Sequence, residues 1–119
     1  MKTVFPAIVI ALITSACATT TNVNLDSAQA SGKSPELWSD HKALPMPVGA
    51  CGDQAFKTLN ALGYTGVVRN GNYSYGNLNG NRAAVKCVDT GGNSFVYFAV
   101  AGPQRTKVEE LRNAIAHTF

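Results

Sequence analysis

The three cysteines constrain the fold of this 119-residue chain more than any other feature does. Cys17 stands at the end of an apolar leader, whereas Cys51 and Cys87 lie in the part of the chain that carries folding periodicity. Two cysteines in an exported chain predict one disulfide, because the compartments outside the cytoplasm are oxidising. A Cys51–Cys87 bond closes a long loop, and the chain-entropy model gives it a stabilisation of roughly 3 to 4 kcal/mol.

A reactive thiol at Cys51 is the alternative, because this residue lies just before a predicted helix and a helix N-terminus lowers a thiol pKa. The sequence around Cys51 has no CxxC pair and no neighbouring histidine. The pattern therefore favours the structural disulfide.

Residues 1–16 have the layout of a secretory signal peptide. Lys2 supplies a positive charge, an apolar run follows from residue 4 to residue 13, and small residues come next. A run of about ten apolar residues is too short for a membrane-spanning helix, which needs about 20. We therefore expect residues 1–16 to direct export.

The segment Thr14-Ser15-Ala16-Cys17 resembles the lipobox of bacterial lipoproteins, in which small residues precede the cysteine that receives the lipid. The resemblance covers only the leader, and Thr14 stands where leucine is usual. It implies cleavage before Cys17, diacylation of Cys17, and a protein anchored to the membrane by that lipid. Ala18 resembles the outer-membrane sorting pattern, which implies an outer-membrane protein facing the periplasm. The alternative is cleavage after Ala18, which would release a soluble periplasmic protein.

A change of composition divides the rest of the chain. Residues 17–33 are rich in Thr, Ser, Asn and Ala without an apolar period, which predicts a flexible tether. Residues 34–50 are interpreted as a linker with room for one short helix, because Ser34-Pro35 is typical of a helix start and Pro45 follows soon after. We expect residues 51–119 to form the folded domain.

Two helices and several strands are predicted within this domain. Apolar residues at helical spacing predict one helix over residues 53–62, ended by Gly63, and another over residues 107–117. Between them, residues 65–69, 82–88 and 94–100 and the segment around Tyr73 and Tyr75 have strand patterns. Turn pairs separate these strands, namely Asn70-Gly71, Asn79-Gly80 and Gly91-Gly92.

The fold class that follows is α+β. We expect a small antiparallel sheet of three to four strands, with a preceding and a following helix packed on one face and one disulfide. The disulfide would then hold the first helix to the strand that carries Cys87.

Charge and motif content argue against several functions. The formal net charge of +3 is too small and too evenly spread for nucleic-acid binding. His41 and His117 are the only histidines, and a zinc site needs three or four convergent ligands. No nucleophile, nucleotide or zinc-protease motif occurs. We therefore expect no catalytic residues, no metal and no cofactor, and a protein that is not an enzyme.

A stretch of Asn, Gly and Tyr from residue 70 to residue 82 is the candidate binding region. Tyrosine rings and amides can contact a sugar or a protein partner, although turn chemistry and strand packing also explain this composition. Trp38 is either a partner anchor or a side chain that docks on the domain. The candidate partner-binding surface consists of Trp38, Arg69, Tyr73, Tyr75 and Arg82.

The function that these observations favour is that of a non-enzymatic cell-envelope lipoprotein. Lipid on Cys17 would anchor it, and the domain would bind an envelope protein or a cell-wall component. One alternative is a periplasmic inhibitor of an envelope enzyme, which presents rigid loops. Another is a small enzyme or ligand-binding protein whose site carries no recognisable motif.

Overall fold

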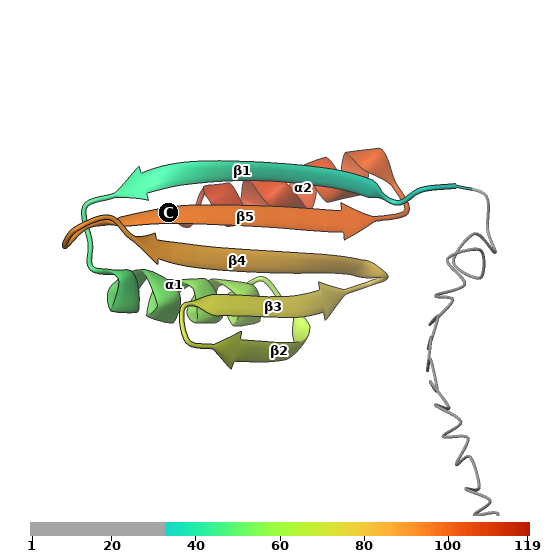
Figure 1. Ribbon diagram of the computed structural model, residues 1–119. Helices are drawn as coiled ribbons and strands as arrows, with labels where there is room; N and C mark the ends of the chain where they lie inside the picture. The colour runs from blue at the N-terminus through green and yellow to red at the C-terminus, as the bar shows by residue number, and fades with distance from the viewer. Residues whose placement is uncertain (1–32) are drawn as a thin grey trace, which may run out of the picture. The chain divides into compact units, whose positions relative to one another are not determined.

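The computed structural model describes residues 33–119, and its five strands form one antiparallel sheet in the order β1-β5-β4-β3-β2 (Figure 1). The elements in chain order are β1 (Glu36–Leu44), α1 (Val48–Ala61), β2 (Thr65–Asn70), β3 (Tyr73–Leu78), β4 (Asn81–Asp89), β5 (Ser94–Gly102) and α2 (Arg105–Ala116). The predicted α+β class and the antiparallel pairing are confirmed. The number of strands was underestimated, because the sheet has five strands rather than three or four.

The missing strand is β1, and the interpretation of residues 34–50 as a linker with a short helix was wrong. β1 pairs with β5 along its whole length, from Glu36 opposite Gly102 to Leu44 opposite Ser94. Only Leu44 of this strand is buried. An edge strand with so few buried side chains lacks the apolar alternation that identifies a strand in a sequence. The folded part therefore begins well before Cys51.

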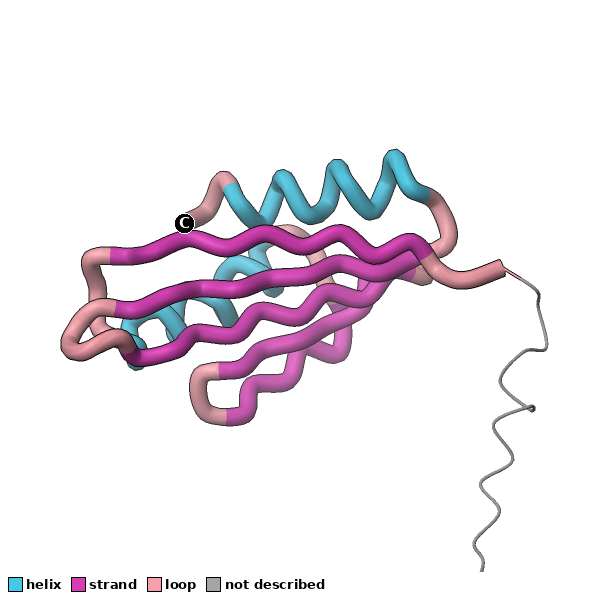
Figure 2. The backbone as a smooth tube through the Cα atoms, turned by 45° about the horizontal axis from the view of Figure 1, so that its top comes forward, coloured by secondary structure: helices cyan, strands magenta, loops and turns pink. Residues whose placement is uncertain are grey.

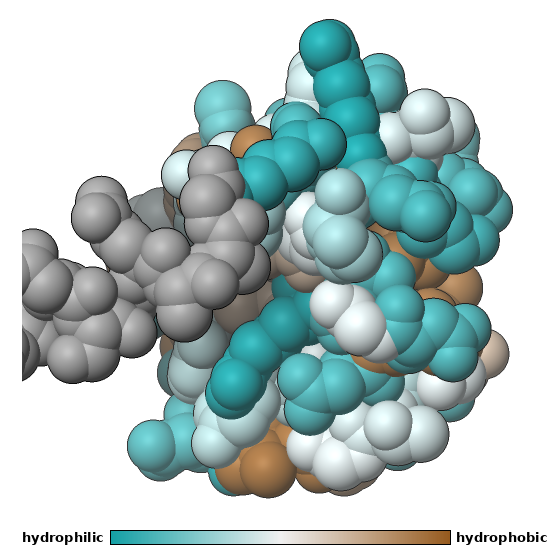
Figure 3. Space-filling view, turned by 90° about the vertical axis from the view of Figure 1, so that its right-hand side faces the viewer, coloured by the Kyte–Doolittle hydropathy of each residue, from teal (hydrophilic) through white to brown (hydrophobic). Residues whose placement is uncertain are grey.

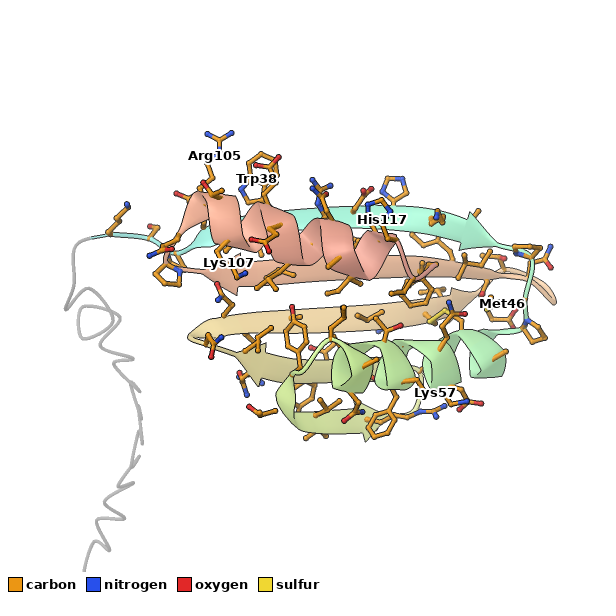
Figure 4. All side chains as sticks on the ribbon, turned by 180° about the vertical axis from the view of Figure 1, so that it is seen from behind. Trp38, Met46, Lys57, Arg105, Lys107 and His117 are labelled. Carbon is orange, nitrogen blue, oxygen red and sulfur yellow. A yellow bond between two sulfur atoms is a disulfide. The ribbon has the colours of Figure 1, made fainter. Side chains whose placement is uncertain are left out.

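Alternation along the two central strands divides the sheet into a buried face and an exposed one. Ala83, Val85 and Cys87 of β4 are buried, as are Val96, Phe98 and Val100 of β5, whereas the residues between them are partly or fully exposed. Figures 2 and 4 show both helices against the buried face of the sheet. The core lies between these two layers, where Leu59 of α1 and Val108 and Ile115 of α2 are completely buried.

The helix α1 starts earlier than its predicted start at residue 53. It begins at Val48, directly after Pro47, whose extended backbone precedes the first turn. The predicted end is close to the observed one. Gly63 has φ +85°, and the amide of Tyr64 donates to the carbonyl of Leu59 at 3.0 Å, which closes the last turn.

The predicted hairpin turns join β2 to β3, β3 to β4 and β4 to β5. In the β3–β4 turn, Asn79 and Gly80 both have positive φ, 48° and 76°, which a two-residue turn between twisted strands requires. In the β4–β5 turn, the carboxylate of Asp89 accepts hydrogen bonds from the amides of Gly91 and Gly92 at 2.9 and 3.2 Å. These turns set the register that aligns the side chains on each face.

The predicted disulfide is present between Cys51 of α1 and Cys87 of β4, whose Cα atoms are 6.0 Å apart. Both half-cystines are buried, with exposed fractions of 0% and 3%. The bond links the helical layer to the sheet, as expected from the positions of the two cysteines. Their burial and pairing exclude the alternative of a reactive thiol at Cys51 in this oxidised form.

Candidate functional site

The face of the sheet that no helix covers is the most prominent surface of the described residues, and Figure 1 shows it from the front. We call it the open face. Strand register assigns to it Leu37, Ser39, His41, Ala43, Val68, Asn70, Tyr73, Tyr75, Asn77, Arg82, Ala84, Lys86, Val88, Phe95, Tyr97, Ala99 and Ala101. All five strands contribute, so residues as far apart in the chain as Leu37 and Ala101 form one surface.

Exposed apolar side chains are concentrated on the open face. Within residues 33–119 the large hydrophobic side chains that are exposed are Leu37, Val68, Val88 and Tyr97, at 43 to 66%. All four belong to the open face by register. By contrast, the end of the molecule shown in Figure 3 is mostly hydrophilic, with smaller hydrophobic patches. Because all four share one face, this face is the candidate interaction surface.

Aromatic rings accompany these residues. Tyr73 and Tyr75 lie on the same side of β3, with ring centroids 5.4 Å apart. Arg82 of the neighbouring strand places its guanidinium carbon 4.9 Å from the centre of the Tyr75 ring. At the other side of the face, the rings of His41 and Phe95 are stacked with centroids 5.2 Å apart. These contacts hold the rings in place, which reduces the entropy that a partner would have to remove on binding.

The charges on the open face are all positive. Arg82 and Lys86 of β4 belong to it. Among residues 33–119, by contrast, no acidic side chain does: Glu36, Asp40 and Asp89 are on the helix-covered face by register, and the others lie on α1 and α2. The ion pairs of the described residues are Arg69–Asp53, Lys107–Glu110 and Arg112–Asp40, so Arg82 and Lys86 take part in none of them.

The structure brings together three of the five residues predicted to form the binding surface. Tyr73, Tyr75 and Arg82 are neighbours on the open face. Arg69 is not part of it, because its register partner Ser74 is buried beneath the helices and its guanidinium pairs with Asp53 of α1. The prediction for Arg69 was therefore wrong. It did not take into account that adjacent side chains of a strand point to opposite faces.

Trp38 also lies on the helix-covered side, so its assignment to the same surface was wrong. It is opposite the buried Val100, and Figure 4 shows it beside Arg105 at the start of α2. The guanidinium carbons of Arg105 and Arg112 are 5.0 and 5.8 Å from the centre of the indole ring. Trp38 thus docks on the domain and joins α2 to β1.

An ion pair strengthens this junction of α2 and β1. Arg112 donates to the carboxylate of Asp40 at 3.1 Å. The pKa of the Asp40 carboxyl is lowered, first by the hydrogen bond from the backbone amide of His41 and then by the charge of Arg112. The ion pair between Arg112 and Asp40 therefore has a structural role, because it attaches the last helix, α2, to the edge strand β1.

The residues that the sequence did not single out come mainly from the first and last strands. Leu37, His41, Lys86, Phe95 and Tyr97 complete the open face. The alternation of side chains along a strand would have predicted that Tyr97 and Phe95 lie on the same side of β5, because they are two positions apart. The contacts with β1 depend on pairing between residues at least 50 positions apart in the chain, which no local pattern reveals.

A shallow hollow of about 530 Å³ lies beside α1. Asp53, Gln54, Lys57 and Thr58 of α1 line it together with Thr118. The side-chain amide of Gln54 donates to the carbonyl of Thr118, and the hydroxyls of Thr58 and Thr118 are 3.1 Å apart. These hydrogen bonds attach the C-terminal segment to α1, so the polar groups of Gln54, Thr58 and Thr118 already serve the fold.

Within the described part of the chain, no three His, Cys, Asp or Glu side chains are grouped as metal ligands. No helix among residues 33–119 is both long and apolar enough to cross a membrane. Cys17, the predicted lipidation site, lies outside the described residues. Comparisons with protein-family models, with curated proteins and with solved structures found no match for this chain.

Proposed function

We propose that this protein is a non-enzymatic binding module of the bacterial cell envelope, anchored by lipid on Cys17, facing the periplasm and contacting its partner through the open face. The observation that carries the binding role is the concentration of exposed Leu37, Val68, Val88 and Tyr97 on the one face that no helix covers. The lipobox resemblance of Thr14-Ser15-Ala16-Cys17 supports the anchor.

Apolar side chains on such a face cost free energy while they are in contact with water. An antiparallel sheet with one solvated face normally carries polar side chains there. Here β5 presents Phe95, Tyr97, Ala99 and Ala101 to the open side. These residues add nothing to the core, and their exposure favours association with another molecule.

Site-specific photocrosslinking in the cells that make the protein tests the binding role. A photoreactive phenylalanine analogue is placed at Tyr97 on the open face, and in a control chain at Lys57, which is exposed on α1. We expect one defined adduct after irradiation of the Tyr97 variant and none from the Lys57 variant. Equal labelling at both positions, or none at Tyr97, contradicts the proposal.

The lipid anchor is tested separately by the intact mass of the protein from the membrane fraction. We expect the mature chain to begin at Cys17 and to carry acyl mass, and the Cys17→Ala variant to carry none. A mature chain that begins at Thr19 without acyl mass would show that the alternative cleavage is used and that the domain is released.

A further inference from the structure

We infer that the partner of the open face is a protein that presents an acidic surface patch bordered by apolar side chains. The inference rests on the proposed function, because it concerns the same face, and it names the chemistry of the partner. Three properties of the face carry it: the sign of its charges, the kind of apolar residue on it, and the absence of charge complementarity between two copies of it.

The first property is the sign of the charges. Arg82 and Lys86 are on one side of β4. They are four positions apart in the strand, which places their Cα atoms about 13 Å from each other. No acidic side chain of residues 33–119 shares this face, and neither cation belongs to an ion pair of the described residues. Stacking on Tyr75 fixes Arg82 and leaves its N–H groups able to donate to a carboxylate. The complementary surface is therefore anionic.

The second property separates a protein from a glycan. Tyrosine rings suit both partners, because they stack on sugars and pack in protein interfaces. Leu37, Val68 and Val88 are aliphatic and exposed on three different strands of the same face. Aliphatic side chains have no ring to stack on a sugar, whereas they fill the apolar centre of a protein interface beside Tyr and Arg. The composition of the face thus favours a protein.

The third property disfavours a second copy packed face to face. Such a pair would place four cations in one interface, namely Arg82 and Lys86 of each chain. Like charges in a shared interface cost free energy, and no acidic side chain on the described face could compensate them. Two cations are also too few for the phosphate contacts of a nucleic-acid site.

The test measures binding of two polymers to the intact mature protein in a neutral detergent, by fluorescence anisotropy of labelled probe. One probe is the random copolymer of glutamate and tyrosine, which combines carboxylates with apolar surface. The other is polygalacturonate, a glycan with carboxylates and no apolar side chains. We expect the copolymer to bind about tenfold more tightly than the glycan, and its binding to weaken as salt increases.

Charge-reversal variants then locate the site. Arg82→Glu with Lys86→Glu should weaken copolymer binding by about tenfold or more, because both contacts become repulsive. The matched control is Lys42→Glu with Lys57→Glu, which has the same net charge and alters two exposed lysines on the helix-covered side. We expect the control to weaken binding by less than about threefold, since only long-range attraction changes. Circular dichroism checks that both variants are folded.

Several results would overturn the inference. These are a failure of the copolymer to bind, equal or tighter binding of polygalacturonate, and equal weakening by the two double variants. The photocrosslinking result distinguishes this failure from failure of the proposed function. A defined adduct at Tyr97 together with any of these results leaves the open face as the binding surface and shows that its partner is not an acidic protein.

Discussion

At the scale of single residues, neighbouring side chains of β5 differ sharply in their exposure to solvent. Phe98 is 1% exposed and its ring stacks against Phe119, with centroids 6.2 Å apart. Tyr97, the residue before it, is 45% exposed on the open face. Both are large aromatic residues in one strand, so they allow the structural and the binding roles to be compared directly.

Replacing these two residues by alanine should have very different effects on stability. We expect Phe98→Ala to lower the free energy of unfolding by about 3 to 5 kcal/mol, through lost burial and the cavity that remains. Tyr97→Ala should lower it by about 1 kcal/mol or less, because Tyr97 is outside the core and nearly half exposed to solvent. Urea denaturation followed by circular dichroism measures both. Equal losses would show that the open face is part of the core.

Tyr64 provides a pH-dependent test of the packing between α1 and the sheet. It is 4% exposed, and within residues 33–119 its hydroxyl has no hydrogen-bond partner. Burial raises the pKa of Tyr64 to about 12, from an ordinary value of 10.0. Between these values the folded state keeps the proton that the unfolded state releases, so stability falls as pH rises.

We expect the Tyr64→Phe variant to be as stable as the wild type at pH 7, or more stable by about 1 kcal/mol, because it removes a buried hydroxyl without a partner. Between pH 9 and pH 12 the wild type should lose about 2 to 3 kcal/mol more than the variant does. Urea denaturation at several pH values measures the difference. Parallel pH profiles would mean that Tyr64 is accessible to water in the folded protein.

At the scale of elements, the disulfide is the covalent link between the two layers. Cys51 and Cys87 are 36 residues apart in the sequence and join α1 to β4. We expect the double variant Cys51→Ala with Cys87→Ala to lower the free energy of unfolding by roughly 3 to 4 kcal/mol, chiefly because the unfolded chain is no longer constrained. Adding a reductant should destabilise the wild type and leave this variant unchanged. A reductant effect of the same size on both would assign the loss to another cause.

The sequence was sufficient for the elements with strong local signals. The apolar stripe through Cys51, Ala55 and Leu59 identified α1, and the turn pairs separated β2, β3, β4 and β5. The strand β1 was not recognised, because most of its side chains are exposed to solvent or contact α2 instead of the core, so that the sequence lacks apolar alternation. Trp38 and Asp40, for example, contact arginines of α2 instead of entering the core. Only pairing with β5 makes this segment a strand, and that pairing is tertiary.

The candidate site, like the fold, was predicted correctly only where the sequence carries a local signal. Tyr73 and Tyr75 were correctly placed together, since residues two apart in a strand share a face. Arg69 and Trp38 were wrongly included, because the sequence does not show which face the helices cover. The part of the open face that comes from β1 could not be predicted, because the register of β1 with β5 depends on contacts between distant segments. Position on the sheet, rather than residue type, decided which aromatic residues are free to bind.

At the scale of the whole molecule, the fold separates stability from recognition. The disulfide, the buried face and both helices lie on one side of the sheet, whereas Tyr73, Tyr75, Tyr97, Arg82 and Lys86 lie on the other. A small domain with a single core can tolerate changes on such a face, because few of its side chains contribute to burial. Surface variants of the open face should therefore fold and lose only binding.

If the open face is the binding surface, a partner covers it in the cell. Hydroxyl-radical footprinting tests it by comparing the purified protein with the same protein in intact cells. We expect Tyr97, Tyr73 and Leu37 to be oxidised several-fold less in cells, and Phe56 on α1 to react equally in both samples. Unchanged oxidation of the three open-face residues, or equal protection of Phe56, would contradict the account.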